Sequence, residues 1–306
     1  MTDEAERERG FALVLVIWVL ALLSILAAAL AVDSRNAVEI ARNRLELAHA
    51  RAAADAGATL AIYGLLDPNL SGRWRADGTT RTVRYNGSTV AIRVGDEGGK
   101  IDLNVAAADF IGDLLAELGI DGRQAIVADI LSRRQSFAAE LPSFTTGRRL
   151  PGTDPGGVNR SVLPFATASE LRLFTAISRA DYERIRPYVT VYSQAPTVNP
   201  LTAPRAVLLA VPGVSAQQVD FLIAARAAAS VGQPADIPRL SGVDRYVAPR
   251  DIPAATITAT ATTKAGASFA REAIVSLSLA TPLQPFRIEQ WGQAITPSVP
   301  LQARKE

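Results

Sequence analysis

The chain has 306 residues, of which 48% are apolar and 20% charged, so it can bury a core in about two domains and is too apolar for wholesale disorder. It contains no cysteine and a single histidine, His49, which excludes a disulfide framework, cysteine-ligated zinc, thiol catalysis and every motif that needs two histidines. The formal net charge of +2 comes from 32 basic and 30 acidic residues, and this balance gives no sign of a nucleic-acid-binding surface.

The N-terminus combines a short charged leader, Met1 to Gly10, with an uncharged apolar segment from Phe11 to Val32. About 20 helical residues span a bilayer core about 30 Å thick, so this segment predicts a transmembrane helix. A secretory signal differs, because its apolar region is shorter and its small-residue cleavage site follows that region. A plain single-pass anchor or an uncleaved signal stays open as an alternative. More arginines follow the segment than precede it, which mildly opposes a cytoplasmic N-terminus.

Apolar residues continue beyond Val32 at steps of three and four, the spacing of an amphipathic helix, and no proline occurs before Pro68. We therefore predict one continuous helix from Phe11 to Leu66, whose second half packs this stripe on a soluble domain. Gly57 is expected where the helix approaches a sheet closely. The stripe consists of Val38, Ala41, Leu45, Ala48, Ala52, Ala56, Leu60 and Tyr63.

Strand-like segments flank a long middle part of the chain. The dipeptide Asn86-Gly87, between two alternating segments, is a strong hairpin signal. A second pair is joined by a turn at Lys264–Gly266, and a last short strand follows it. The predicted strands are Arg81–Tyr85, Ser88–Val94, Thr256–Thr263, Ser268–Leu279 and Phe286–Trp291.

The middle, about Leu103–Pro253, has the pattern of helices, with a Gly/Pro-rich loop from Pro142 to Pro164. Thr202 is predicted as a helix N-cap with Pro204 in the first turn. The predicted helices are Asp109–Leu118, Ala125–Arg134, Ala168–Phe174, Arg179–Pro187, Arg205–Val211 and Ala216–Ala229. The predicted fold class is α+β: a long N-terminal helix, first transmembrane and then amphipathic, packs on an antiparallel sheet that carries a large all-helical insertion.

The leader and the helix resemble those of type IV pilins and pseudopilins. This resemblance implies that the sheet is pilin-like and that the helical insertion is similar to SAM or helix-hairpin-helix domains. The resemblance implies that prepilin peptidase cleaves between Gly10 and Phe11 and that Phe11 is then N-methylated. Most pilins carry glutamate at the fifth mature position, which here is Leu15. The large minor pseudopilin K of type II secretion, the GspK family, characteristically lacks this glutamate, a feature that suits a subunit at the tip of the filament.

Two internal segments resemble the same K family. Val94–Asn104 (VGDEGGKIDLN) is similar to its strand-end pattern, and Val198–Val214 (VNPLTAPRAVLLAVPGV) is similar to its second helical unit. The family's Trp-x-Asp and Gly-Ala-Glu elements are missing around Asp129–Arg134. The chain is therefore identified as a divergent member, and calcium binding is not carried over to any residue.

The resemblance implies a minor pseudopilin that caps the periplasmic pseudopilus for protein export and is not an enzyme. It would cross the bacterial inner membrane once, with the N-terminus in the cytoplasm and the soluble part in the periplasm. Its implied partners are other minor pseudopilins, the major pseudopilin and, transiently, prepilin peptidase. The expected division is a leader at 1–10, a transmembrane half-helix at 11–32, core at 33–102, an inserted helical domain at 103–252 (units at about 103–192 and 196–252), returning strands at 253–292 and a tail at 293–306.

Other functions have weaker support from the residues. The glycines near Lys100 lack the spacing of a phosphate loop, and Asp96, Glu97 and Asp102 lack the spacing of an EF-hand, so a calcium ion there stays only an open alternative. The segment 208–216 resembles a helix-hairpin-helix turn, so the alternative function is a membrane-tethered DNA-binding or uptake protein. We expect no catalytic, cofactor-binding or metal-ligating residue, no nucleic acid and no small-molecule substrate.

Overall fold

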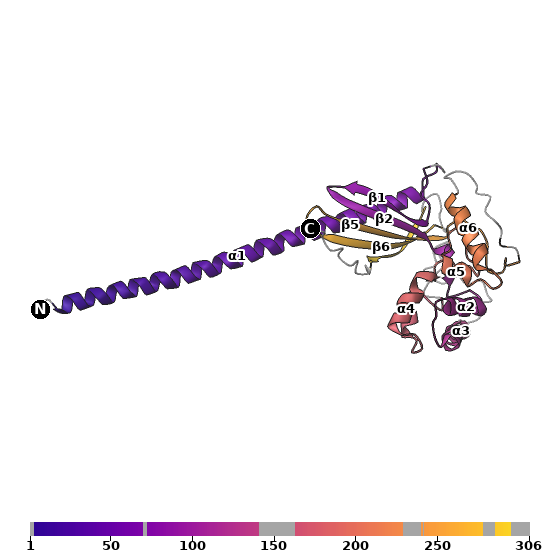
Figure 1. Ribbon diagram of the computed structural model, residues 1–306, viewed down its shortest axis with the longest axis horizontal. Helices are drawn as coiled ribbons and strands as arrows, with labels where there is room; N and C mark the ends of the chain where they lie inside the picture. The colour runs from indigo at the N-terminus through magenta and orange to yellow at the C-terminus, as the bar shows by residue number, and fades with distance from the viewer. Residues whose placement is uncertain are drawn as a thin grey trace.

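The computed structural model describes residues 3–69, 72–140, 163–228, 240, 242–277 and 285–294, and it describes their side chains except at 3–14, 28–34 and 139–140. One helix of 63 residues, α1 (Asp3–Leu65), projects far from the rest of the molecule (Figure 1). The predicted continuous helix is confirmed, although it begins before Phe11. Most of the predicted loop Pro142–Pro164 lies outside the described residues.

A five-stranded antiparallel sheet forms the body next to α1, with the strand order β1-β2-β5-β6-β7. The predicted hairpin is confirmed, because Tyr85 pairs with Ser88 and both turn residues have positive φ, 43° at Asn86 and 78° at Gly87. The strands are β1 (Asp77–Tyr85), β2 (Ser88–Asp96), β5 (Ala254–Thr262), β6 (Ser268–Ser276) and β7 (Arg287–Gln293).

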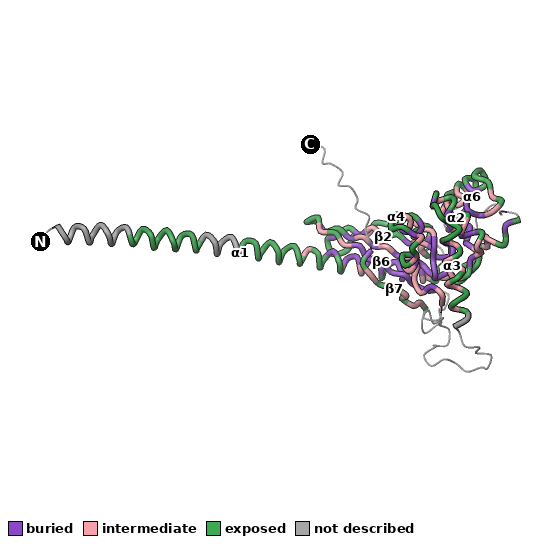
Figure 2. The backbone as a smooth tube through the Cα atoms, turned by 90° about the horizontal axis from the view of Figure 1, so that it is seen from below, coloured by how far each residue is buried: buried purple, intermediate pink, exposed green. Residues whose placement is uncertain are grey.

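The C-terminal part of α1 packs on one face of the sheet, while its described residues at 15–27 and 35–49 are almost all exposed (Figure 2). A Cβ atom at Gly57 would lie 2.7 Å from Val90 Cγ1, so glycine permits the close approach that was predicted there. The residues of α1 buried at this contact are mostly alanines: Ala53, Ala54, Ala58, Ala61, Ile62 and Leu65.

The predicted contact stripe was the wrong face of α1. Two of its members, Leu60 and Tyr63, are 41% and 74% exposed. At about 100° per residue, the alanine face and the predicted stripe lie on opposite sides of the helix. Small side chains let the helix backbone come close to the sheet, and the larger residues of the predicted stripe face away from it.

The helices of the middle segment fall between β2 and β5, at the end of the sheet remote from the projecting part of α1 (Figure 1). A short parallel ladder joins β3 (Ile101–Asp102) to β4 (Val189–Thr190), so this region is not all-helical as expected. It has its own core, which includes the fully buried Phe110 and Phe165. Its helical elements are η1 (Glu97–Gly99), α2 (Ala108–Glu117), α3 (Arg123–Glu140), η3 (Ala168–Leu173), α4 (Arg179–Ile185), η4 (Arg186–Tyr188), α5 (Arg205–Leu209) and α6 (Ala216–Ala228).

The predicted N-cap at Thr202 was also wrong. Helix α5 begins at Arg205, Pro204 holds the N-cap position, and no side chain caps the helix. The Thr202 hydroxyl instead donates a hydrogen bond of 2.6 Å to Asp96 Oδ2. The Thr202 hydroxyl, which was predicted to cap the helix, thus binds a buried carboxylate at the end of β2 instead.

Candidate functional site: an exposed helix and a buried acidic junction

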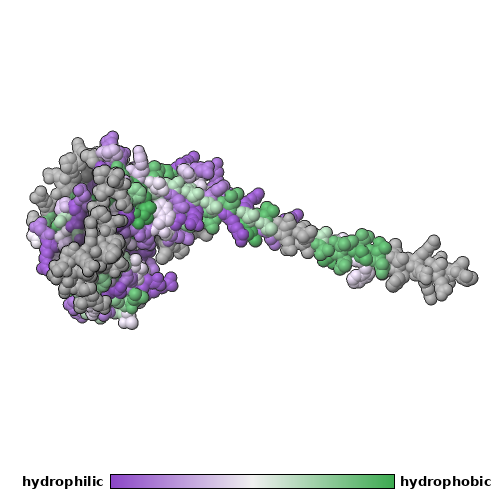
Figure 3. Space-filling view, turned by 180° about the vertical axis from the view of Figure 1, so that it is seen from behind, coloured by the Kyte–Doolittle hydropathy of each residue, from purple (hydrophilic) through white to green (hydrophobic). Residues whose placement is uncertain are grey.

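Between Leu15 and Ala27, the projecting part of α1 exposes a nearly unbroken apolar surface, seen as the green segment of the helix in Figure 3. Trp18 is 72% exposed and Ile25 68%. Soluble monomers rarely expose a contiguous apolar surface of this extent, and such a surface is typical of contact with protein or lipid. Its exposed members include Leu15, Val16, Ile17, Trp18, Val19, Leu20, Leu22, Leu23, Ile25 and Leu26.

The predicted transmembrane segment Phe11–Val32 lies within α1, and its side chains are described only from Leu15 to Ala27. Among the described residues, no helix is both long enough and apolar enough to cross a membrane. Of the predicted site residues, Gly10 and Phe11 lie in α1 but outside the described side chains, and Leu15 is 55% exposed. Cleavage at Gly10 and methylation of Phe11 stay predictions.

One buried arginine fixes α1 to the sheet. Arg271 of β6 is 5% exposed, and its Nε donates to Asp55 Oδ1 at 2.5 Å. The guanidinium carbon lies 5.1 Å from the centre of the Phe269 ring and 5.4 Å from that of Trp291. These contacts satisfy the buried cation with a carboxylate and two aromatic faces, so they hold α1 in one position on the sheet.

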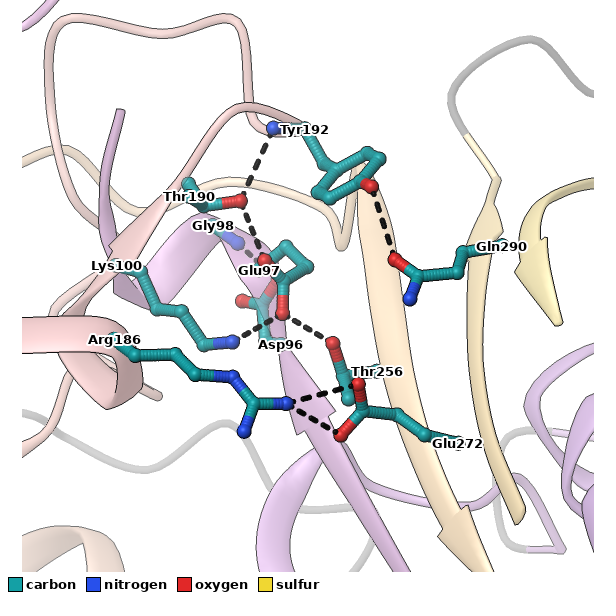
Figure 4. Close-up of polar contacts among 10 residues, drawn as sticks. All are labelled: Asp96, Glu97, Gly98, Lys100, Arg186, Thr190, Tyr192, Thr256, Glu272 and Gln290. Atoms are coloured by element: carbon teal, nitrogen blue, oxygen red, sulfur yellow. Dashed lines mark hydrogen bonds and ion pairs between the residues drawn. The ribbon is translucent and has the colours of Figure 1, made fainter. Parts of the chain in front are cut away.

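The far end of the sheet meets the helical region at three buried acids, Asp96, Glu97 and Asp102, which we call the acidic junction. Glu97, at the centre of Figure 4, is 2% exposed and is held by three side chains. Lys100 forms an ion pair with it, Thr190 donates from β4, and Thr256 donates from β5. This one carboxylate therefore links the sheet to the helical region.

Asp96 makes the second connection. Its carboxylate accepts hydrogen bonds from the Gly98 amide at 2.7 Å, Asn199 Nδ2 at 3.1 Å and the Thr202 hydroxyl. Burial raises the pKa of this carboxyl, although the three donors act in the opposite direction. The two segments that resemble the K family, Val94–Asn104 and Val198–Val214, thus meet in space.

Asp102, in β3, is 1% exposed and joins two segments within the helical region. It accepts from the Asn104 amide at 2.8 Å, the Gln194 amide at 2.7 Å and the Ser193 hydroxyl at 3.1 Å. Burial raises its pKa as well, against these hydrogen bonds and the attraction of Arg134.

A half-buried ion pair completes the contact beside the junction. Arg186 of η4 donates to both carboxylate oxygens of Glu272 on β6, at 3.1 and 3.2 Å (Figure 4). No local feature of the sequence pointed to this pair or to the threonine donors, because each contact joins residues far apart in the chain. The residue pattern identified the three acids of the junction only as acidic residues near a glycine-rich turn.

The open calcium alternative gains no support from this geometry. Each acid of the junction accepts from its own set of protein donors. The described residues contain no group of three or more His, Cys, Asp or Glu side chains placed to hold a metal ion. The chemistry of the site is that of a polar, hydrogen-bonded joint between two parts of the fold.

Two backbone amides of the hairpin between α5 and α6 already donate within the protein. The Val214 amide donates to Val211 O, and the Ser215 amide donates to Gln218 Oε1. A shallow pocket beside the turn is also lined by Asp113 and Glu117 of α2. Carboxylates at this position repel phosphate, so the pocket opposes the DNA-binding alternative.

Comparison with known proteins supports the fold. No protein-family profile matches the chain, and no curated protein matches it. Among solved structures, it is similar to a chain of the crystal structure of the GspK-GspI-GspJ complex from the type 2 secretion system of enterotoxigenic Escherichia coli. The TM-score is 0.50 and the identity 12%, over 86% of this chain and 100% of that chain. At this identity the likeness concerns the fold alone, which is a pseudopilin-like fold that resembles the minor pseudopilins of type II secretion.

Proposed function

We propose that this chain is a K-type minor pseudopilin of a bacterial type II secretion system and that it caps the tip of the periplasmic pseudopilus. Its role is assembly and not catalysis. The observation that carries this proposal is the projecting helix α1, whose exposed apolar surface is joined to a pseudopilin-like α/β body.

The proposed membrane arrangement follows from α1. Phe11–Val32 anchors the chain in the inner membrane, with the leader in the cytoplasm and the sheet in the periplasm. During assembly the same apolar surface leaves the lipid and packs on the helices of neighbouring pseudopilins. Because both environments are apolar, the exposed side chains of α1 are covered in each of them.

Two features support a place at the tip. Leu15 lacks the carboxylate that would pair with the terminal amine of a subunit ahead, and an unpaired carboxylate in an apolar filament core would be costly. The helical region extends the body beyond the end of the sheet (Figure 1). Within the filament wall, a neighbouring subunit would occupy this space. A subunit at the end has room for this region.

The experiment that tests the class is co-expression of the full chain with a prepilin peptidase, followed by intact-mass analysis and N-terminal sequencing. We expect a mature chain that begins at N-methylated Phe11. Gly10→Leu should leave the chain uncut, because a bulky side chain blocks the peptidase at the junction. Ala5→Leu adds similar bulk farther upstream and should be cut like the wild type.

Two results would contradict the proposal. One is a wild-type chain that keeps Met1 or Thr2 as its first residue in the presence of an active peptidase. The other is a Gly10→Leu chain that is shortened to Phe11 as efficiently as the wild type.

A further inference from the structure

Strand β1 leaves one edge of the sheet open. It is the first strand in the order β1-β2-β5-β6-β7, and in the described part of the chain only β2 pairs with it. Its residues from Thr79 to Tyr85 are exposed, except for the half-buried Val83. The strand contains no proline, and its register shift is confined to the stretch between Asp77 and Thr80. An exposed regular edge of this kind is a template for another strand.

The hairpin geometry shows which backbone groups face the open edge. The two-residue turn makes Tyr85 and Ser88 a hydrogen-bonded pair, and such pairs alternate with non-hydrogen-bonded pairs along an antiparallel ladder. Three pairs of the ladder are therefore non-hydrogen-bonded: Arg84 with Thr89, Thr82 with Ala91 and Thr80 with Arg93. The N–H and C=O groups of Thr80, Thr82 and Arg84 point away from β2, toward the open edge.

The side chains along this edge carry positive charge. Arg84 makes no ion pair with any described residue, and Arg81 lies with its guanidinium carbon 5.0 Å from the centre of the Trp74 ring. The one acid of the strand, Asp77, stands at its beginning and pairs with Arg75. The opposite edge of the sheet differs, because β7 carries both charge signs in the ion pair of Arg287 with Glu289.

We propose that the β1 edge binds an extended acidic segment of a partner protein, which adds a further antiparallel or parallel strand to the sheet. The backbone groups of Thr80, Thr82 and Arg84 supply the main-chain hydrogen bonds. Arg84 lies on one face of the strand and selects acidic side chains at alternating positions of the bound segment, because alternating positions share a face. Pairing with a second copy of this chain is disfavoured, because it would bring two copies of both arginines together along one short ribbon.

The test uses the full chain in detergent micelles and two capped peptides, Thr-Glu-Val-Glu-Val-Glu-Thr and its Lys-for-Glu counterpart. Hydrogen–deuterium exchange should show that the glutamate peptide protects the backbone amides of residues 80–84. The affinity for this peptide, measured by fluorescence anisotropy, should exceed that for the lysine peptide by about tenfold or more, the ratio that corresponds to about 1.4 kcal/mol.

The matched variants separate edge pairing from folding. Thr82→Pro removes an outward N–H and leaves the ladder with β2 intact, so it should lower the affinity by about tenfold without changing the melting temperature. Thr82→Val keeps the N–H and should bind like the wild type. Arg84→Gln keeps every amide and should reduce the preference for the glutamate peptide.

Clear results would overturn the proposal. These are unchanged binding by Thr82→Pro, no protection at residues 80–84 at saturating peptide, or equal affinity for the two peptides. If Thr82→Pro lowers the melting temperature, Arg84→Gln decides the outcome, and an unchanged peptide preference in that variant refutes the acidic partner.

Discussion

At the scale of single residues, Asp102 shows how the junction depends on one carboxylate. It is 1% exposed and accepts three hydrogen bonds, one from the segment after β3 and two from the segment after β4. In Asp102→Asn, the side-chain NH2 group would replace one carboxylate oxygen. This group would face N–H or O–H donors from which it cannot accept a hydrogen bond. We expect the free energy of unfolding to fall by about 1–3 kcal/mol, the usual cost of leaving buried donors unsatisfied. Urea unfolding followed by circular dichroism measures it, and Asp121→Asn, at an exposed position, is the matched control.

The pH dependence of this effect has a definite sign. Because burial raises the pKa of Asp102, the folded state binds its proton more tightly than the unfolded state does. The carboxyl therefore contributes most to stability below its unfolded pKa of about 3.8, and this contribution is lost as the pH rises through the folded pKa. The difference in stability between wild type and Asp102→Asn should thus be larger at low pH than at neutral pH. An equal or opposite trend would contradict the assignment.

At the scale of elements, Gly99 sets how closely η1 approaches the segment before α5. A Cβ atom at Gly99 would lie 2.9 Å from both Ala203 N and Thr202 C, which are backbone atoms and cannot rotate away. Gly99→Ala should therefore separate the two segments and destabilise the protein by about 1–3 kcal/mol. Gly112→Ala is the control, because its Cβ would meet nothing closer than 3.9 Å and alanine favours the helix. Thermal unfolding compares them, and equal melting temperatures would refute this role of Gly99.

The elements also show what the sequence could and could not predict. Local signals predicted that α1 is one continuous helix and that β1 and β2 form a hairpin, since helical spacing and Asn86-Gly87 act within a few residues. Periodicity could not choose between the two apolar faces of α1, because it records polarity and not the small size that lets alanines pack against a sheet. The acidic junction was out of reach as well. Its bond between Thr202 and Asp96 joins residues 106 positions apart, and nothing local marks Thr202 as a partner of the sheet.

At the scale of the whole molecule, α1 has two apolar faces with different tasks. The alanine face packs on the sheet, and the opposite face continues along the helix with Val38 58%, Leu45 56% and Tyr63 74% exposed. In the proposed assembly, the helices of neighbouring pseudopilins pack on this second face of α1, because the sheet leaves it uncovered. A subunit that folds alone and then packs on other subunits needs both faces: a buried apolar face for its own core, and an exposed apolar face on the opposite side for its neighbours.

Because folding and assembly use different faces of α1, substitutions on the exposed face should impair assembly without impairing folding. Leu60→Glu combined with Tyr63→Glu alters exposed positions, so the melting temperature should stay within a few degrees of the wild type, in line with about 0.5 kcal/mol for each surface change. If the proposed function holds, copurification of the other minor pseudopilins should nevertheless be lost, because two charges would be buried at the contact. Arg44→Glu, an exposed charged position on another side of α1, should retain these partners. If the double variant keeps its partners at wild-type levels, the outer face of α1 is not an assembly surface, and the contact with other subunits must lie on the exposed apolar segment from Leu15 to Leu26.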